Sequence, residues 1–309
     1  MAQRKTARVA VLGGGNSPER EVSLRSARAV SAALSQAGYE VSELDPSHYD
    51  TDSLIAQLAG FDVVFPVLHG KGGEDGTVQA LLESIGMPFV GAGADVSALC
   101  FDKTAYKAHL QELGLSLPFG VVVDRNTVWS QELTKSPFVL KPYDGGSSVD
   151  TFIIRDPQAC DRAAIEDALD RHHTMLLEEL IIGTEITVGV VGEEALPVIE
   201  IIPPADQEFD YENKYNGQTQ ELCPPQHVEE SVQITARQLA AHIHTRLNIR
   251  DFSRTDLMIR QGDDRLFILE TNTIPGMTDQ SLLPKAAKTA GYDMAVLCDR
   301  LVSAALERK

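Results

Sequence analysis

The stretch between residues 254 and 281 constrains the fold of this chain more than any other. Two apolar runs in it flank a polar Gly/Asp turn at 261–264, and this pattern predicts a β-hairpin. If residues 261–265 form the loop, Asp256 on the first strand lies opposite Glu270 on the second. The hairpin therefore brings two carboxylates together on one patch of a sheet.

These carboxylates share their faces with other polar side chains, because successive residues of a strand point to opposite sides. Arg254 and Met258 lie on the same face as Asp256, and Asn272 lies on the same face as Glu270. Two facing carboxylates repel unless a cation lies between them, and oxygen ligands without His or Cys suit Mg²⁺. The alternative is that both acids belong to an ordinary solvated sheet face.

The first hundred residues alternate between strand and helix patterns. The apolar run at 9–12 is typical of a buried parallel strand. The whole pattern predicts strands at 9–12, 40–44 and 62–67, and helices at about 17–37, 51–59 and 77–85. Such alternation predicts a parallel sheet with helices on both faces, and function at the carboxyl ends of its strands. Two loops lie there, at 13–23 and 69–76.

The glycine loop after the first strand resembles a dinucleotide-binding turn, with Asp45 as the acid for a ribose. The pattern fails because Pro18 stands where Gly or Ala is required after Gly13 and Gly15. No GxxxxGK[ST] sequence occurs, which excludes a P-loop. A Rossmann dehydrogenase is therefore disfavoured.

The residues after this loop predict the start of a helix, with Ser17 as N-cap, Pro18 at the first position and Glu19 in the first turn. Acids are common in first turns because they interact favourably with the helix dipole. Glu19 is therefore either such a residue or a carboxylate that receives a substrate ammonium at the strand-end crevice.

The middle of the chain offers two lysines and a flexible loop. One helical pattern runs from about 95 to 113 and carries Lys103, and the strand 137–141 ends in Lys141. The Gly- and Ser-rich loop at 143–149 precedes a strand at 150–154, and its N–H groups could wrap phosphate oxygens or merely form a hairpin turn. A helix near 157–170 and a strand at 175–180 follow. Glu178 on that strand could accept from an adenine amino group or a ribose hydroxyl, or be a strand end.

The last third contains strands at 185–191 and 195–202, a helix at 229–248, and closing helices near 281–290 and 293–306. Between them lies a polar and aromatic loop at 209–225, and loops of that length are usually functional lids or disordered. The paired histidines at 172–173, and those at 242 and 244, are expected to be structural or exposed to solvent.

Composition restricts the classes of partner. The net charge of −18 argues against nucleic acid and anionic membranes, so a phosphate-bearing substrate needs local Lys, Arg or metal. The four cysteines are widely spaced, which indicates reduced thiols rather than a disulfide frame or zinc cluster. The start lacks a signal-peptide pattern, and no apolar run reaches about 18 residues. We therefore expect a cytoplasmic protein of two or three domains.

With these residues in view, the chain resembles the D-alanine–D-alanine ligases of the ATP-grasp superfamily from about residue 8 to 306. The motifs that carry the resemblance are GGNSPEREVS at 14–23, HGKGGEDG at 69–76, DK at 102–103, KP at 141–142, GSSV at 146–149, DYENKY at 210–215, RTD at 254–256 and ETNTIPGMT at 270–278. The resemblance implies an ATP-grasp fold of class α/β and α+β, with an N-terminal parallel-sheet domain and two domains that sandwich ATP. The expected domains are 1–100, 101–185 and 186–309.

The resemblance implies the following nucleotide and metal residues. The residues expected to bind the phosphates are Lys103, Lys141, Ser147, Ser148 and Lys214. Glu178 and Glu185 are expected to contact the adenine and ribose, and Ile181, Phe209 and Met258 also lie at the nucleotide. Asp256, Glu270 and Asn272 are expected to bind two Mg²⁺ or Mn²⁺ ions. Whether a monovalent cation assists stays open.

The resemblance also implies a reaction. The carboxylate of one D-alanine attacks the γ-phosphate of ATP, and the amine of a second attacks the resulting acylphosphate to give D-alanyl-D-alanine for peptidoglycan. The implied substrate and catalytic residues are Glu19 and His69 for the first D-alanine, Arg254 and the Gly276 N–H for the oxyanion, Ser281 and Leu282 for the second carboxylate, and a trio of Glu19, Ser147 and Tyr215.

Some features bear on alternatives. Tyr215 favours an amine nucleophile, because relatives that use D-lactate lack this tyrosine. Asp150 replaces the usual Gly, Glu179 replaces a frequent Lys, and the loop after Lys214 is about one residue shorter than in some relatives. A different second substrate, D-serine or D-lactate, and a non-catalytic nucleotide-binding relative are the alternatives. A homodimer is usual for the family.

Overall fold

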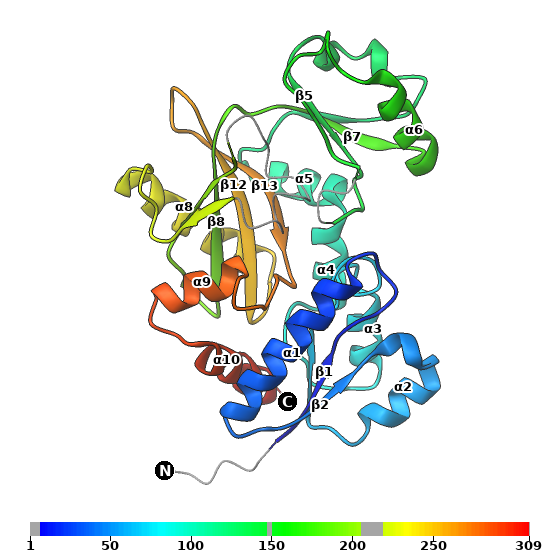
Figure 1. The fold of residues 1–309 in the computed structure, drawn as a ribbon, viewed down its shortest axis with the longest axis vertical. Helices are drawn as coiled ribbons and strands as arrows, with labels where there is room; N and C mark the ends of the chain where they lie inside the picture. Colours follow the sequence, from blue (N-terminus) through cyan, green and yellow to red (C-terminus); the bar gives the residue numbers. More distant parts are fainter. Residues whose placement is uncertain (1–6, 147–149, 205–218, 309) are drawn as a thin grey trace.

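A computed structural model describes residues 7–146, 150–204 and 219–308. Within them the chain forms three sheets, of three, four and six strands, with helices packed against each (Figure 1). The first sheet is parallel and the other two are antiparallel, so the predicted combination of α/β and α+β architecture is confirmed.

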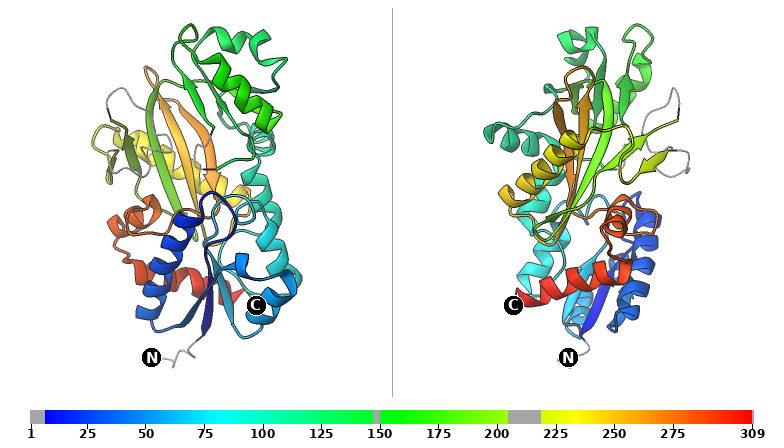
Figure 2. Two further views of the ribbon diagram at one scale, coloured as in Figure 1. Left: turned by 45° about the vertical axis from the view of Figure 1, so that its right-hand side comes forward. Right: turned by 90° about the vertical axis from the view of Figure 1, so that its left-hand side faces the viewer.

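The N-terminal sheet has the order β2-β1-β3, with β1 (Arg8–Leu12) in the middle. Its core is apolar because Val9 to Leu12 are completely buried. The other elements of this layer are β2 (Glu40–Leu44), β3 (Val63–Pro66), α1 (Arg20–Gln36), α2 (Thr51–Leu58) and α3 (Thr77–Ser84). Helix α1 packs on one face and α2 with α3 on the other, as the alternating pattern predicts (Figure 2).

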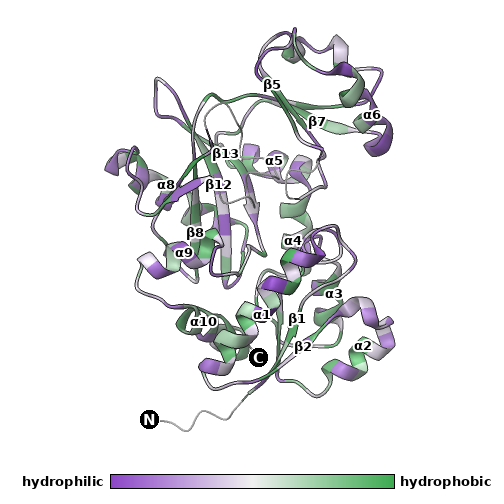
Figure 3. Cartoon of the chain, in the orientation of Figure 1, coloured by the Kyte–Doolittle hydropathy of each residue, from purple (hydrophilic) through white to green (hydrophobic). Residues whose placement is uncertain are grey.

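The last helix of the chain completes this N-terminal layer. Helix α10 (Met294–Glu307) packs beside α1, and its Leu297, Leu301 and Val302 join the core of Val9 and Val11. Figure 3 shows the apolar colouring of α10 where it meets the blue N-terminal elements of Figure 1. The sequence predicts this helix but gives no hint of its partner.

The four-stranded sheet has the order β4-β7-β5-β6, covered by α6 (Arg162–His172). Its strands are β4 (Gly120–Val123), β5 (Phe138–Lys141), β6 (Phe152–Ile154) and β7 (Met175–Glu179). Strands β5 and β6 pair as the predicted hairpin. The predicted start of β6 at residue 150 is wrong, because Asp150 has a left-handed φ of 53° that ends strand geometry.

The six-stranded sheet carries the hairpin from which the sequence argument began, and α8 (Glu230–Arg246) covers one of its faces. Its strands are β8 (Gly183–Val191), β9 (Glu194–Ala195), β10 (Ile199–Ile202), β11 (Gln220–Leu222), β12 (Phe252–Arg260) and β13 (Leu266–Asn272). Asp256 lies opposite Glu270, as predicted. The register shifts by one residue after Asp256, so a β-bulge produces this pairing.

The predicted single helix over 95–113 is wrong. The structure has two helices, α4 (Ala94–Phe101) and α5 (Lys103–Glu112), separated by Asp102. Asp102 has extended backbone angles, and its carboxylate accepts from the N–H groups of Thr104 and Ala105. The acid therefore caps a new helix instead of continuing the old one.

The remaining elements agree with the sequence pattern. Helix α9 (Leu282–Thr289) precedes α10, and short 3-10 helices lie at 46–48, 128–130 and 132–135. His244 is buried against Ser253 and His242 is exposed, which confirms the structural interpretation of both. The domain boundaries stay a prediction; strand β8 begins at Gly183, so the large sheet starts just before residue 186. No helix in the described ranges is both long and apolar enough to cross a bilayer.

Candidate active site

Two cavities meet at the centre of the molecule. The inter-sheet cavity, about 510 Å³, is lined by the four-stranded sheet on one side and the six-stranded sheet on the other. The junction cavity, about 610 Å³, is lined by the N-terminal loops and by residues that follow β13. Both are lined by Lys103, Gly145, Gly146 and Glu270, so the two cavities adjoin at these residues.

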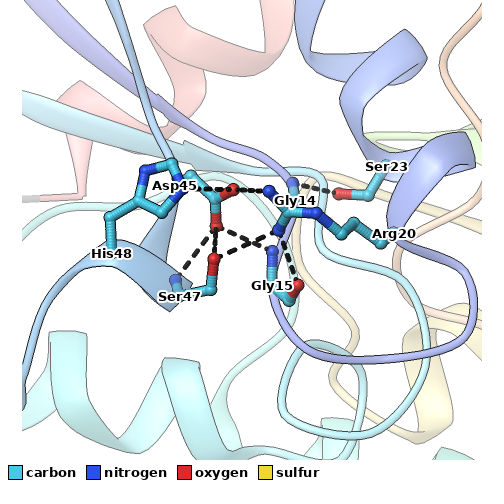
Figure 4. A network of polar contacts seen from close by, with 7 residues as sticks. All are labelled: Gly14, Gly15, Arg20, Ser23, Asp45, Ser47 and His48. Atoms are coloured by element: carbon cyan, nitrogen blue, oxygen red, sulfur yellow. Dashed lines mark hydrogen bonds and ion pairs between the residues drawn. The ribbon is translucent and has the colours of Figure 1, made fainter.

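The glycine loop at the mouth of the junction cavity is fixed by polar contacts (Figure 4). The Gly15 N–H donates to Asp45 at 3.0 Å, and Arg20 ion-pairs with Asp45 while donating to the Gly15 carbonyl at 2.7 Å. The Gly14 N–H donates to Ser23 Oγ at 2.9 Å. Asp45 is thereby engaged with the protein itself, which explains why it does not serve a ribose.

Glu19, the residue before Arg20 in this network, lines the junction cavity. Helix α1 begins at Arg20, three residues after the predicted N-cap Ser17, so the predicted helix start is too early. Ser17 Oγ still accepts from the Glu19 N–H at 3.2 Å, as a capping residue does, and it donates to the His69 carbonyl at 2.6 Å. Glu19 occupies the N-cap position without a side-chain cap bond. A Cβ added to Gly146 would lie 2.6 Å from Glu19 Oε1, so only glycine lets that loop approach this carboxylate.

Two further groups from the predicted loop at 69–76 line the junction cavity. Burial lowers the pKa of His69 to about 4, so its ring is neutral, and its Nε2 lies 3.2 Å from Ser26 Oγ. Withdrawal from water and the nearby charge of Glu19 raise the pKa of Glu74 to about 8. The Gly70 N–H donates to Glu74 at 2.6 Å. Glu74 was not singled out by the sequence, although it lies in the quoted motif.

The predicted metal residues lie together on the face of the hairpin. The Asn272 amide lies 3.2 Å from Asp256 Oδ2, and Glu270 is directly opposite Asp256. Their charges are offset by cations: Arg254 donates to Asp256 through two nitrogens at 2.9 and 2.7 Å, and Lys103 lies 3.4 Å from Glu270. Burial opposes the charge of Arg254, but Asp256 raises its pKa.

The donor set fits a hard divalent cation. Two carboxylates and one amide group lie side by side without His or Cys; the Asn272 amide nitrogen donates to Asp256, and the amide oxygen is the atom that would ligate a metal. Thr187 donates to Asp256 at 2.5 Å, which orients it. Within the described part of the chain no cluster of three His, Cys, Asp or Glu residues forms a ready metal cage. Such a set leaves coordination positions for substrate oxygens, as Mg²⁺ in phosphoryl-transfer sites requires.

The inter-sheet cavity contains a buried ion-pair cluster that the sequence did not predict in full. Glu178, only 4% exposed, pairs with Lys141 at 2.6 Å and also with Lys107. These lysines, Lys141 ahead of Lys107, lower the pKa of Glu178 despite its burial. Sequence reasoning missed Lys107, and the signal that could have found it is its position one turn after Lys103 on α5.

The other expected nucleotide residues fall into two groups. Ile181, Glu185 and Met258 line the inter-sheet cavity together with Lys103 and Lys141. Residues that lie outside the described ranges are Ser147, Ser148, Phe209, Lys214 and Tyr215.

The residues expected at the second substrate lie on the far wall of the junction cavity. Ser281 precedes α9 as its N-cap, and Leu282 is the first residue of that helix. A Cβ on Gly276 would lie 2.8 Å from Ser281 Oγ, so a larger residue there would displace the Ser281 side chain. Ser281 Oγ also accepts from the Thr278 N–H at 3.1 Å.

Comparison with known proteins agrees with this geometry. Residues 111–303 match the family described as "D-ala D-ala ligase C-terminus", and residues 47–92 match "D-ala D-ala ligase N-terminus". The chain is 41% identical to a D-alanine–D-alanine ligase of Syntrophobacter fumaroxidans, with 97% of each chain covered. It is 42% identical to a ligase of the same name from Aromatoleum aromaticum, with 95% of this chain and 94% of the relative covered.

The fold is also that of a solved structure. The D-alanine–D-alanine ligase of Bacillus anthracis, crystallised with ATP, superposes with a TM-score of 0.83 at 29% identity, covering 98% of both chains. The predicted ATP-grasp fold is thereby confirmed. Matches to both family halves and relatives at about 40% identity over nearly the full length lead to one conclusion: the chain belongs to the D-alanine–D-alanine ligase family.

Proposed function

We propose that this protein joins two D-alanine molecules to D-alanyl-D-alanine at the expense of ATP, through a D-alanyl phosphate. The observation that carries the proposal is that the two cavities adjoin at Lys103 and Glu270, which line both. A nucleotide between the sheets would present its terminal phosphate to an amino acid held in the junction cavity. Reactants held in this relation react without the entropy loss of a bimolecular encounter.

The inter-sheet cavity supplies the local positive charge that a triphosphate needs in a chain of net charge −18. Lys141 and Lys103 would contact the phosphates, and Glu178 keeps Lys141 charged by raising its pKa against the effect of burial. Ile181 and Met258 would contact the base, and Glu185 the ribose. The parts that Ser147, Ser148, Phe209 and Lys214 play at the nucleotide follow from the family resemblance.

The set of Asp256, Glu270 and Asn272 would hold two Mg²⁺ or Mn²⁺ ions. When bound, such ions offset the charge on the transferring phosphoryl group and its bridging oxygens. Arg254 pairs with Asp256 and Lys103 pairs with Glu270. Both cations therefore lie next to the place where negative charge would develop in the reaction.

The junction cavity would hold the two amino acids. Glu19 would accept from the ammonium of the first D-alanine, next to the neutral His69. Arg254 and the Gly276 N–H would stabilise the tetrahedral oxyanion that forms when the amine of the second D-alanine attacks the acylphosphate. Ser281 and the Leu282 N–H would bind the carboxylate of this second D-alanine. Removal of one such oxyanion donor typically costs about 2.7–4 kcal/mol.

The trio of Glu19, Ser147 and Tyr215 would orient the first substrate and close the site, and Tyr215 favours an amine nucleophile over D-lactate. This assignment rests on the family resemblance and on the closeness of Glu19 to Gly146.

A phosphate-release assay tests the proposal. We expect release that requires both D-alanine and Mg²⁺, and D-alanyl-D-alanine as the product by mass spectrometry. Parallel reactions with D-serine and D-lactate measure preference for the second substrate. ATP binding without D-alanine-dependent turnover would instead identify a non-catalytic relative. Sedimentation velocity checks the homodimer that the family resemblance implies.

A further inference from the structure

Lys285 is a cation in the junction cavity that the expected roles leave unused. It lies on α9 one turn after Ser281, and its backbone N–H donates to the Ser281 carbonyl at 3.1 Å. Its ammonium ion-pairs with Glu221 on β11, and both side chains line the cavity. The Lys285 side chain is 31% exposed and that of Glu221 is 14% exposed, so the pair lies in the wall rather than on open surface.

The other buried cations near this wall already have partners. Arg254 uses two nitrogens on Asp256, and Lys103 contacts Glu270 and donates to the Gly145 carbonyl at 2.6 Å. An ammonium has three donors, and among the described residues Glu221 is the one side-chain acceptor that the structure shows for the Lys285 ammonium. Lys285 therefore has capacity for a second anion without losing Glu221.

The proposed reaction supplies such an anion. The carboxylate of the first amino acid is consumed in the chemistry, but that of the second stays charged throughout. A charge withdrawn from water needs a paired partner. Ser281 does not cap α9 with its side chain, so the positive end of this helix also faces that position.

We propose that Lys285 recognises the carboxylate of the second amino acid, and that Glu221 moderates the charge of this lysine. The inference rests on the proposed function and extends it: Lys285 determines that the nucleophile is an amino acid with a free carboxylate rather than a simple amine. The competing interpretation is that the pair only ties α9 to β11.

The test varies the lysine and the substrate together. The purified enzyme receives D-alanine for the first site and either D-alanine or D-alaninamide as nucleophile, and mass spectrometry quantifies both products. We expect Lys285→Met to raise the second-site KM for D-alanine about tenfold or more, the effect of losing a hydrogen bond to a charged group. Turnover with D-alaninamide should be unchanged, which also shows that the variant is folded. Lys288→Met, at an exposed position on the same helix, is the matched control.

Glu221→Gln separates the two interpretations by the direction in which the second-site KM changes. If Lys285 binds the carboxylate, release from Glu221 leaves the KM for D-alanine unchanged or lower. If the pair is only a tie, Glu221→Gln and Lys285→Met weaken both nucleophiles equally, and that result overturns the inference. Equal activity of Lys285→Met and the wild type with both nucleophiles also overturns it. Absence of dipeptide from the wild type would overturn the proposed function itself, an outcome distinct from dipeptide formation that is indifferent to Lys285.

Discussion

The two cavities solve the problem of buried charge in different ways. In the inter-sheet cavity Glu178 is flanked by Lys107 and Lys141, and all three come from the part of the chain between residues 103 and 178. In the junction cavity the charged groups come from both ends of the chain, with Glu19 and Glu74 facing Arg254 and Lys285. The first site is assembled by neighbouring elements, whereas the second exists only when the N-terminal layer packs against the large sheet.

The ion pair of Arg254 with Asp256 connects the two sites. Arg254 lines the junction cavity and Asp256 lines the inter-sheet cavity. A change at this pair should therefore affect both substrates, whereas changes inside either cavity should affect one.

The largest effect is expected from Asp256→Asn. The variant removes a carboxylate of the proposed metal set and the charge that holds Arg254, so kcat should fall on the order of 10³-fold and both KM values should rise. Steady-state kinetics with ATP and D-alanine measure this. Asp263→Asn, exposed at the tip of the same hairpin, is the control. A loss confined to one substrate would separate the cavities that we describe as coupled.

The next effect distinguishes the two lysines on Glu178. Lys141→Met should raise the KM for ATP about ten- to hundredfold with little change for D-alanine. Lys107 donates to the Pro118 carbonyl and does not line the cavity, so Lys107→Met should mainly lower stability, by about 1–3 kcal/mol, because Glu178 keeps its pair with Lys141. Thermal unfolding and ATP kinetics on both variants measure this difference. Identical profiles would show that the cluster acts as one unit.

A smaller, one-sided effect is expected in the junction cavity. Glu19→Gln should raise the first-site KM for D-alanine about tenfold, since a charge-assisted hydrogen bond to the ammonium is weakened. The KM for ATP should stay nearly constant. Unchanged D-alanine kinetics would assign Glu19 to the start of α1 alone.

The junction cavity should also limit stability at both ends of the pH range. His69 has a pKa near 4 when folded, below its usual 6.5, so the unfolded chain binds more protons and stability falls as pH drops from 6.5 to 4. Glu74 has a raised pKa near 8, so stability falls as pH rises from 4.5 to 8. At pH 5.5 the lowered pKa of His69 reduces the free energy of unfolding by about 1 kcal/mol relative to neutral pH. Urea unfolding of His69→Gln and Glu74→Gln should show each slope reduced; parallel curves for variant and wild type would contradict this.

The smallest effect is expected at Asp150, where the family usually has Gly. Its carboxylate contacts Arg171 at 2.8 Å and His172 at 2.7 Å, and these contacts connect residue 150 to α6. Exposed pairs contribute about 0.2–1 kcal/mol, so Asp150→Gly should change the KM for ATP less than about fivefold. Steady-state kinetics with ATP measure it, and a change of tenfold or more would contradict the small role assigned to this pair.

Much of the fold was accessible from local patterns because local interactions decide it. The alternation in the first hundred residues predicted the parallel sheet, and the hairpin pattern predicted that Asp256 would face Glu270. Errors occurred where one side chain changed the local outcome. Asp102 divided a periodic apolar pattern by capping α5, and Ser17, which also bonds to the distant His69 carbonyl, lies three residues before the start of α1.

The sequence alone determined the family motifs, the strand and helix pattern, and most of the acids and lysines that we propose to serve a nucleotide. Only the tertiary structure decided which charges pair. Lys107 joins Glu178 across 71 residues, and Arg308, near the end of the chain, joins the buried Asp251 and the Phe89 carbonyl. Periodicity records the face on which a residue lies, but a buried ion pair depends on how separate layers meet. The two cavities depend on the same packing, so they belong to the structure rather than to any motif.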